Sequence, residues 1–517
     1  TLYLFAIALK KWLGLYGISG MGGSEDDAVY RSLHAILFAS NPMNGSENKR
    51  LKVAYGGEDS VDELLEGNRV AEFVENETQK NIAQNYVFLE EKIRSAFQEG
   101  PALAAFARTV LYKVWIIATK ISSESQALEI FEKINSRGKA LNSAELLKNL
   151  LFRNALEEDF KAISDQWNVA ADAMFKVRPT RAAGMQFLMK SLLGAKQGQG
   201  TSNRLVFQEW RKELSESEID PTEFATNLAT RAKYVSGIAT SARNEKNKEL
   251  YACRRFNTVQ HLPVVIATQA LSANSDLQQA FFRFLDTRFL ISILAKEQPQ
   301  TLERMIWPWA KNLSALDSNS SIADLRNASA PAIEGLGLLM EQAKLSFMNL
   351  DYSKPSNAKQ IKYVLACASL HVEVGSGDGL MLDVDSFFAP KTFDLDHIFP
   401  RSLAEAADFD LSQGKDWIHN PGNIVLLHSG DNRSQGAMRP ADKVLNYGSS
   451  RLLLTATLAP NGNIAGANDR KLSYLEQLRG VGFNPVDANW HADQARNRAA
   501  AYWTVFENYV ESRLSFN

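Results

Sequence analysis

The sequence predicts a mostly α-helical protein with an α/β segment near the N-terminus and a small module of strands and turns near the C-terminus. Three observations predict this fold class. Apolar residues recur at helical spacing through almost all of residues 156–375. Residues 109–122 are rich in β-branched and aromatic side chains, which favours a strand. Residues 393–447 alternate short apolar runs with Gly, Asn and Asp turns.

The chain is too long for one ordinary domain, with 517 residues and a mass of 57.5 kDa. Its 45% apolar and 22% charged residues exclude a wholly disordered, collagen-like or disulfide-scaffold protein. We expect an N-terminal domain over 1–155 and a helical middle region over 156–375. A module over 376–450 should hold the candidate catalytic residues, and a C-terminal helical tail over 451–517 should pack on this module.

Charge and cysteine content limit the possible partners. The formal net charge is −2, so only local basic patches can argue for a nucleic-acid partner. Cys253 and Cys367 form no C-x-x-C pair, which excludes a zinc site of four thiolates and fits a cytoplasmic protein. No run of 18 apolar residues predicts a membrane span. The chain begins without Met in an apolar helical segment, and we expect further residues upstream.

The first 155 residues read as helices with some strands. Residues 1–18 predict a buried helix, and 32–55 predict paired strands separated by Asn-Pro and Asn-Gly turns. Helical periodicity returns over about 60–110, before the strand predicted at 109–122. Asn142 is a predicted N-cap with Glu145 three residues later, a capping-box variant that starts another helix.

Two segments of the helical middle are locally basic. Residues 176–212 contain eight Lys and Arg against one acid, and residues 231–255 contain seven against two. Such patches suit phosphate contacts. They also suit solvated helix faces that are compensated by the acidic residues of 213–223. The sequence leaves both interpretations open.

The clearest chemical pattern consists of Asp396-His397, then Asn423 before an apolar run, then Asn432 in a polar turn. This order is the layout of an HNH-type ββα-metal nuclease site. A neutral His accepts a proton from water near pH 7. Carboxylate and amide oxygens hold Mg²⁺ or Mn²⁺ while leaving room for phosphate. We therefore expect His397 as general base, Asp396 and Asn432 as metal ligands, and Asn423 as the residue that orients the His loop. The alternative is two turn aspartates and a surface histidine.

The same residues resemble the C-terminal HNH domain of GmrSD-type, modification-dependent (type IV) restriction endonucleases and their phage-defence relatives. The family pattern is Asp-His-Ile-x-Pro, Asn-Leu-x-Leu-Leu and Asn-x-x-Lys-Gly. Asp396, His397, Asn423 and Asn432 match this pattern, and Gln435 replaces the Lys that could contact phosphate. The resemblance implies a metal-dependent endonuclease of a bacterial antiviral system that acts on double-stranded DNA. Modified phage DNA, with glucosylated bases or phosphorothioate linkages, is the implied target.

The family also has an N-terminal sensor domain that resembles the ParB/sulfiredoxin fold and handles a nucleoside triphosphate. The turn Asn135-Ser136-Arg137-Gly138 and the following Lys148-Asn149 helix match that domain. Its Asp-Gly-Gln-Gln-Arg signature is absent from this sequence, so the resemblance implies a partial α/β domain. Arg137 is a candidate phosphate or nucleotide contact, or a structural Arg that holds the turn.

Two functions remain open from the sequence. The first is a nuclease that nicks DNA, or cuts both strands as a homodimer or in two steps. The second is a non-catalytic DNA-binding regulator with a degenerate HNH module. Residues 391–450 contain six Lys and Arg against eight Asp and Glu, a net charge of −2. Such a segment needs phosphate contacts from elsewhere in the chain to grip DNA.

Overall fold

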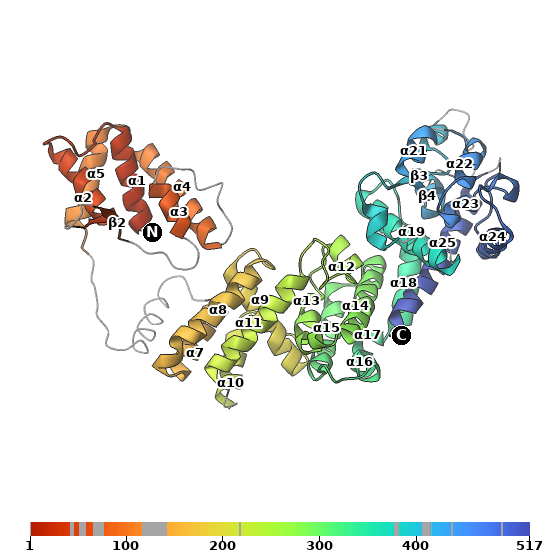
Figure 1. Ribbon diagram of the computed structural model, residues 1–517, viewed down its shortest axis with the longest axis horizontal. Helices are drawn as coiled ribbons and strands as arrows, with labels where there is room; N and C mark the ends of the chain where they lie inside the picture. Colours follow the sequence, from red (N-terminus) through yellow and green to blue (C-terminus); the bar gives the residue numbers. More distant parts are fainter. Residues whose placement is uncertain are drawn as a thin grey trace. The chain divides into compact units, whose positions relative to one another are not determined.

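The computed structural model confirms that the protein is mostly helical. It describes residues 2–41, 46–50, 58–65, 77–115, 142–216, 219–376, 382–405, 414, 416–435, 438–487 and 490–516. These residues divide into two compact units, whose helices and strands are labelled in Figure 1. Unit 1 consists of Thr1–Met189 and Ser202–Ser236, and unit 2 consists of Lys190–Thr201 and Gly237–Asn517. The four-part division of the sequence stays a prediction.

Unit 1 contains helices and one two-stranded antiparallel sheet, β1 with β2. One hydrophobic core of this unit lies between α1, α2, α4 and α5, with Leu9, Leu33 and Leu103 almost fully buried. Helices α9 and α11 cross the boundary between the units along the chain. The elements are α1 (Leu2–Leu15), α2 (Glu25–Leu37), β1 (Phe38–Ser40), β2 (Glu47–Lys49), α3 (Glu58–Leu65), α4 (Glu77–Ala96), α5 (Gly100–Lys113), α7 (Ser143–Asn154), α8 (Phe160–Phe175), α9 (Arg181–Gln197), α10 (Val206–Glu216) and α11 (Pro221–Ile238).

The strand prediction for 109–122 is wrong where the structure describes it, because α5 continues to Lys113. Helix α5 packs on α1 and α2 through Leu103, Ala104 and Ala107, which lie on one helical face. This packing outweighs the β propensity of the residues that follow. Within 32–55, residues up to Leu37 are helical, and the paired strands begin at Phe38.

The predicted start of α7 is confirmed. The Asn142 side chain accepts hydrogen bonds from the backbone N–H groups of Ala144 and Glu145 at 2.9 and 3.0 Å. The Glu145 carboxylate accepts the N–H of Asn142 at 2.9 Å, which completes a capping box. The preceding turn, which includes Arg137 and Gly138, lies outside the described residues.

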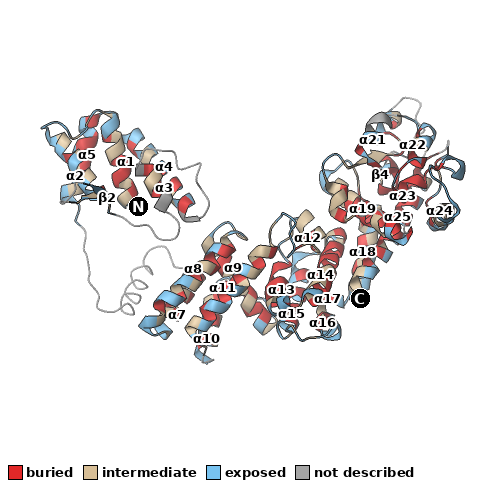
Figure 2. Ribbon diagram, viewed as in Figure 1, coloured by how far each residue is buried: buried red, intermediate tan, exposed pale blue. Residues whose placement is uncertain are grey.

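Unit 2 combines a helical scaffold with the strand pair β3 and β4. Helix α25 packs against α14, α18 and α19, and most of α14 and about half of α25 are buried (Figure 2). The elements are α12 (Tyr251–Arg255), α13 (Leu262–Ala267), α14 (Ser275–Ala295), α15 (Pro299–Ser314), α16 (Ile322–Ala328), α17 (Ala330–Ile333), α18 (Leu336–Met348), α19 (Pro355–Ser376), β3 (Phe393–His397), α20 (Arg401–Ala404), β4 (Ile424–His428), α21 (Ser429–Gln435), α22 (Val444–Gly448), α23 (Leu453–Ala456), α24 (Asp469–Val481) and α25 (Ala492–Leu514).

Short 3₁₀ helices connect this scaffold to the strands, among them η4 (Val384–Phe388), η6 (Asp416–His419), η7 (Pro421–Asn423) and η8 (Pro440–Lys443). Backbone packs directly on backbone where η7 meets α25. A Cβ atom at Gly422 would lie 1.7 Å from the carbonyl oxygen of Ala495 and 2.6 Å from the nitrogen of Ala499. Only glycine fits there, and this close approach fixes the position of the next residue, Asn423.

Candidate active site

The candidate site is built on the antiparallel pair β3–β4, which α21 covers to complete a ββα arrangement. His397 is paired with Ile424 and Asp396 with Val425. The side chains of β4 from Ile424 to Leu427 are buried in the core, whereas every residue of β3 stays partly exposed. The pairing therefore anchors β3 while it keeps Asp396 and His397 near solvent.

Asn423 connects the two halves of the site. Its side-chain oxygen accepts hydrogen bonds from the Phe399 N–H at 2.9 Å and from the Trp490 indole N–H at 3.0 Å. Its amide nitrogen donates to the carbonyls of Phe399 at 3.1 Å and Ile418 at 2.8 Å. The Asn423 carbonyl accepts the N–H of Ile398 at 2.8 Å. This fully buried side chain thus fixes the backbone that follows His397.

Replacing Asn423 with alanine is expected to lower the free energy of unfolding by about 2–4 kcal/mol, because it leaves buried backbone and indole groups without partners. Urea unfolding followed by circular dichroism measures this loss. Asn461→Ala is the matched control, since this asparagine is exposed and its side chain bonds Glu476 and Arg479, away from the site. Equal stability of the two variants would contradict the anchoring role.

Asp396 forms an ion pair with Lys443 of η8. The Lys443 ammonium donates to the Asp396 carboxylate and to the backbone carbonyl of His397, both at 2.7 Å. Lys443 is fully buried, and the Asp396 side chain keeps 16% exposure. Burial raises the pKa of Asp396, and the neighbouring ammonium opposes this rise. Lys443 lies in the protein interior and fixes the last two residues of β3 through these two hydrogen bonds.

His397 faces a second histidine. Its Nε2 lies 3.3 Å from Nδ1 of His419, and the Tyr352 ring packs edge-on with centroids 5.0 Å apart. The pKa of His397 is lowered to about 4, mainly by burial and also by charge repulsion from His419, Lys443 and Arg401. The imidazole is therefore neutral at physiological pH.

The histidine contact couples the tautomers of the two rings, because one ring must donate and the other accept. When Nε2 of His397 carries the hydrogen and donates it to His419, Nδ1 is left as an unprotonated acceptor. Within the described part of the chain, Nδ1 of His397 has no hydrogen-bond partner. A neutral histidine with one free ring nitrogen, held at the end of a strand, has the properties of a general base.

Of the remaining predicted site residues, the structure describes the side chain of Asn432 but not those of Gln435 and Arg137. Asn432 lies partly buried on α21, which packs on both strands. Gln435 ends α21, and its side chain lies outside the description, as does Arg137. Within the described ranges, no three His, Cys, Asp or Glu side chains group as a metal site. A carboxylate offers about four lone-pair sites. The Lys443 ammonium and the His397 N–H occupy some of the lone pairs of the Asp396 carboxylate. The remaining lone pairs fit a hard divalent cation, which prefers oxygen ligands.

Two models of known protein families match parts of this chain. The model of the GmrSD restriction endonuclease N-terminal domain matches residues 24–152, and that of the C-terminal domain matches residues 340–505. Together the two matches cover more than half of the chain. The protein belongs to the GmrSD restriction endonuclease family. It is therefore a restriction nuclease that acts on DNA, as the sequence predicted.

In this GmrSD protein the whole ββα arrangement lies inside the C-terminal match, and the capping box of α7 lies inside the N-terminal match. No curated protein gives a significant match. Among the described helices, none has the length and apolar character needed to cross a membrane.

The sequence did not identify three neighbours of the GmrSD site: His419, Lys443 and Tyr352. Each comes from a segment that shows no motif of its own. The one available signal was that His419 precedes the Asn-Pro-Gly-Asn turn by a single residue, which brings it close to Asn423.

Proposed function

We propose that this GmrSD protein is an HNH-type, metal-dependent DNA endonuclease. The observation that carries the proposal is the neutral His397 at the end of β3, next to Asp396 and fixed through Asn423. The order of these residues in the sequence is that of an HNH site. The arrangement supplies a base, an oxygen donor for a cation and a rigid support, which phosphodiester hydrolysis requires.

The residues have separate roles in this proposal. Asp396 and Asn432 would hold Mg²⁺ or Mn²⁺, which when bound stabilises negative charge on the phosphate and on the leaving oxygen. Nδ1 of His397 takes the proton of the attacking water. His419 is a positioning residue that fixes the tautomer of His397, and Asn423 and Lys443 hold the backbone on either side of the imidazole.

Membership of the family supports DNA as the substrate. A restriction nuclease cuts foreign DNA, and we propose modified double-stranded phage DNA as the target in a bacterial cytoplasm. We propose that the N-terminal matched region senses the modification or a nucleoside triphosphate and controls cleavage. One HNH site cuts one strand, so a double-strand break needs a homodimer or two successive nicks.

Cleavage is expected to depend on a divalent cation. Supercoiled plasmid and modified phage DNA, each incubated with the protein and Mg²⁺ or Mn²⁺, should give nicked or linear products, and excess EDTA should abolish both. Adding the cation back should restore cleavage, which excludes irreversible damage by the chelator. Undiminished cleavage in EDTA would contradict the metal-dependent mechanism. DNA binding without cleavage of either substrate would favour the non-catalytic regulator.

A further inference from the structure

Three cations of unit 2 lie beside the strand that ends at His397. Lys362 of α19 donates from Nζ to the carbonyl of Phe393, the first residue of β3, at 2.6 Å. Lys359 precedes it by three residues and so lies on the same face of α19. Arg255, at the end of α12, is close enough to both lysines to lower their pKa values by charge repulsion, in addition to the larger effect of burial.

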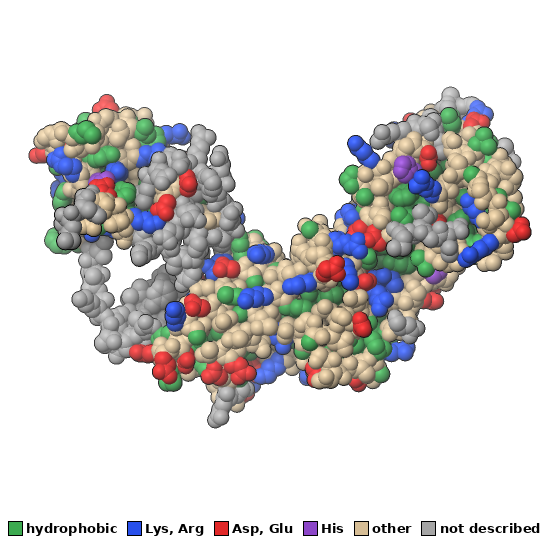
Figure 3. Space-filling view, viewed as in Figure 1, with side chains coloured by type: hydrophobic (Ala, Val, Ile, Leu, Met, Phe, Trp, Pro, Cys, Tyr) green, Lys and Arg blue, Asp and Glu red, His purple; other side chains and the backbone are tan. Residues whose placement is uncertain are grey.

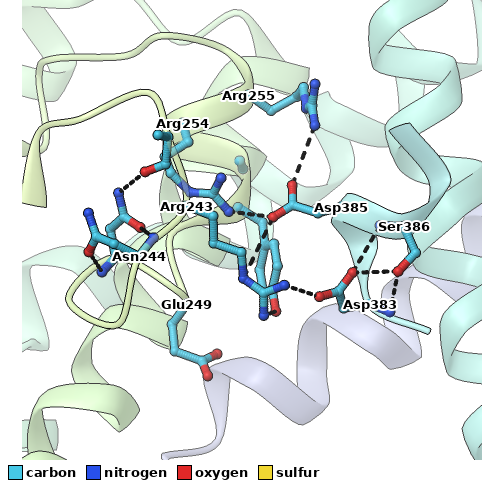
Figure 4. A network of polar contacts seen from close by, with 12 residues as sticks. Arg243, Asn244, Glu249, Arg254, Arg255, Asp383, Asp385 and Ser386 are labelled. Atoms are coloured by element: carbon cyan, nitrogen blue, oxygen red, sulfur yellow. Dashed lines mark hydrogen bonds and ion pairs between the residues drawn. The ribbon is translucent and has the colours of Figure 1, made fainter. Parts of the chain in front are cut away.

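The acidic side chains nearby do not balance this charge. Asp385 is shared by Arg254 at 2.7 Å, Arg255 at 3.4 Å and Arg243 at 3.9 Å (Figure 4). Asp383 pairs with Arg243. Lys362 has Asp394 as a neighbouring negative charge, and no ion pair or hydrogen bond of Lys359 occurs among the described residues.

The charges of this region can be counted. The five cations Arg243, Arg254, Arg255, Lys359 and Lys362 face the three carboxylates Asp383, Asp385 and Asp394, a surplus of two positive charges. Glu249, the other carboxylate in Figure 4, pairs with Arg513 at 3.7 Å. Lys and Arg side chains are also visible near α12 and α19 in the space-filling view (Figure 3).

Aromatic rings hold these cations in place. The Arg255 guanidinium lies 4.3 Å and Lys362 Nζ 5.2 Å from the centre of the Phe388 ring. Lys359 Nζ lies 5.2 Å from the centre of the Phe256 ring. All three side chains stay partly exposed. A cationic side chain that is already held in place loses little conformational entropy when it binds an anion. A mobile, solvated lysine loses more.

The spacing suits the backbone of a nucleic acid. The five residues of β3 cover four steps from Phe393 to His397, which is about 13 Å at about 3.3 Å per step. One strand of B-DNA carries a phosphate about every 3.4 Å along the helix axis, so about four phosphates span this distance. The cations at the start of β3 therefore lie within reach of a duplex whose scissile phosphate is at His397. They also supply the charge that residues 391–450 lack.

We propose that Arg255, Lys359 and Lys362 form a cationic strip that binds the phosphate backbone of the DNA cut at the HNH site. The strip grips the duplex independently of sequence and leaves the reacting phosphate to the residues at the end of β3. This proposal rests on the proposed endonuclease function, because His397 sets the position of the scissile phosphate. Binding by the strip can nevertheless be measured without cleavage.

The test is the salt dependence of binding to a fluorescently labelled unmodified duplex in EDTA, measured by anisotropy between about 50 and 200 mM salt. Lys359→Gln is the main variant, since it removes charge without breaking a hydrogen bond of the described structure. It should reduce the magnitude of the log–log salt slope by about 1, and Lys359→Gln with Lys362→Gln by about 2. Lys311→Gln and Arg326→Gln, at exposed cations of α15 and α16, should bind as wild type does.

Thermal unfolding checks that every variant is folded. Folded strip variants with wild-type affinity and slope would overturn the proposal, as would the absence of salt-dependent binding by the wild-type protein. The outcomes also separate the strip from the nuclease function. Binding that is weakened in the strip variants, without any metal-dependent cleavage by wild type, supports the strip and contradicts the nuclease. Cleavage that is unaffected by the strip variants supports the nuclease and contradicts the strip.

Discussion

Replacing His397 with alanine is expected to slow DNA cleavage by about 10²–10⁴-fold, the usual contribution of a positioned general base. The variant loses the ring nitrogen that accepts the proton of the attacking water. It keeps Asn423, Lys443 and their backbone contacts, so it should stay folded. The measurement is the initial rate of plasmid nicking under metal-saturated conditions.

His371→Ala is the matched control for this prediction. His371 is a partly buried histidine of the same unit, and burial lowers its pKa as well, but it lies on α19 outside the ββα arrangement. Its loss should leave the nicking rate close to that of wild type. Equal rates for wild type and His397→Ala, with both proteins free of contaminating nuclease, would remove His397 from the mechanism.

The pH dependence gives an independent check on His397. Its pKa of about 4 means that the imidazole is neutral from about pH 5 upward, so its protonation should not slow cleavage between pH 6 and 8. The unfolded chain takes up this proton first, near pH 6.5, because its histidine is solvated. The buried neutral imidazole of His397 therefore makes its full contribution to the free energy of unfolding above about pH 6.5. This contribution is lost as pH falls toward 4. A loss of activity centred on pH 6.5, present in both wild type and His371→Ala, would contradict a buried His397.

The sequence predicted the site better than it predicted the surroundings of the site. Asp396 and His397 are adjacent, and Asn423 precedes a run of apolar residues, so short-range spacing identified them. His419 and Lys443 reach His397 and Asp396 across 22 and 47 residues, and only the folded chain shows these contacts. Local pattern cannot predict which distant lysine enters a core, because burial is decided by packing.

In the N-terminal region, one local prediction was correct and another was wrong. The capping box at Asn142 was predictable because its hydrogen bonds connect residues three positions apart. The strand expected from Thr109 was wrong as far as Lys113, because α5 is held by packing on α1 and α2 rather than by its own propensity. Propensity is a weak guide wherever tertiary contacts provide most of the stability.

Replacing Lys443 with methionine is expected to lower the free energy of unfolding by about 3–5 kcal/mol. The change keeps much of the side-chain volume but leaves the Asp396 carboxylate, which is mostly buried, without its cation. It also removes the donor to the carbonyl of His397, so cleavage should fall in the protein that remains folded. Urea unfolding in EDTA measures the loss of stability without a contribution from bound metal.

Lys471→Met is the matched control, because Lys471 also donates to a backbone carbonyl, that of Ala465, but at the surface of unit 2. Its stability should change by no more than about 0.5 kcal/mol. The double variant Lys443→Met with Asp396→Asn should recover much of the lost stability, since no unpaired charge stays buried. It should remain inactive, because the negative charge of the proposed metal ligand is lost. Wild-type stability of Lys443→Met, or a double variant that loses the sum of both single effects, would show that the two side chains do not act as a buried ion pair.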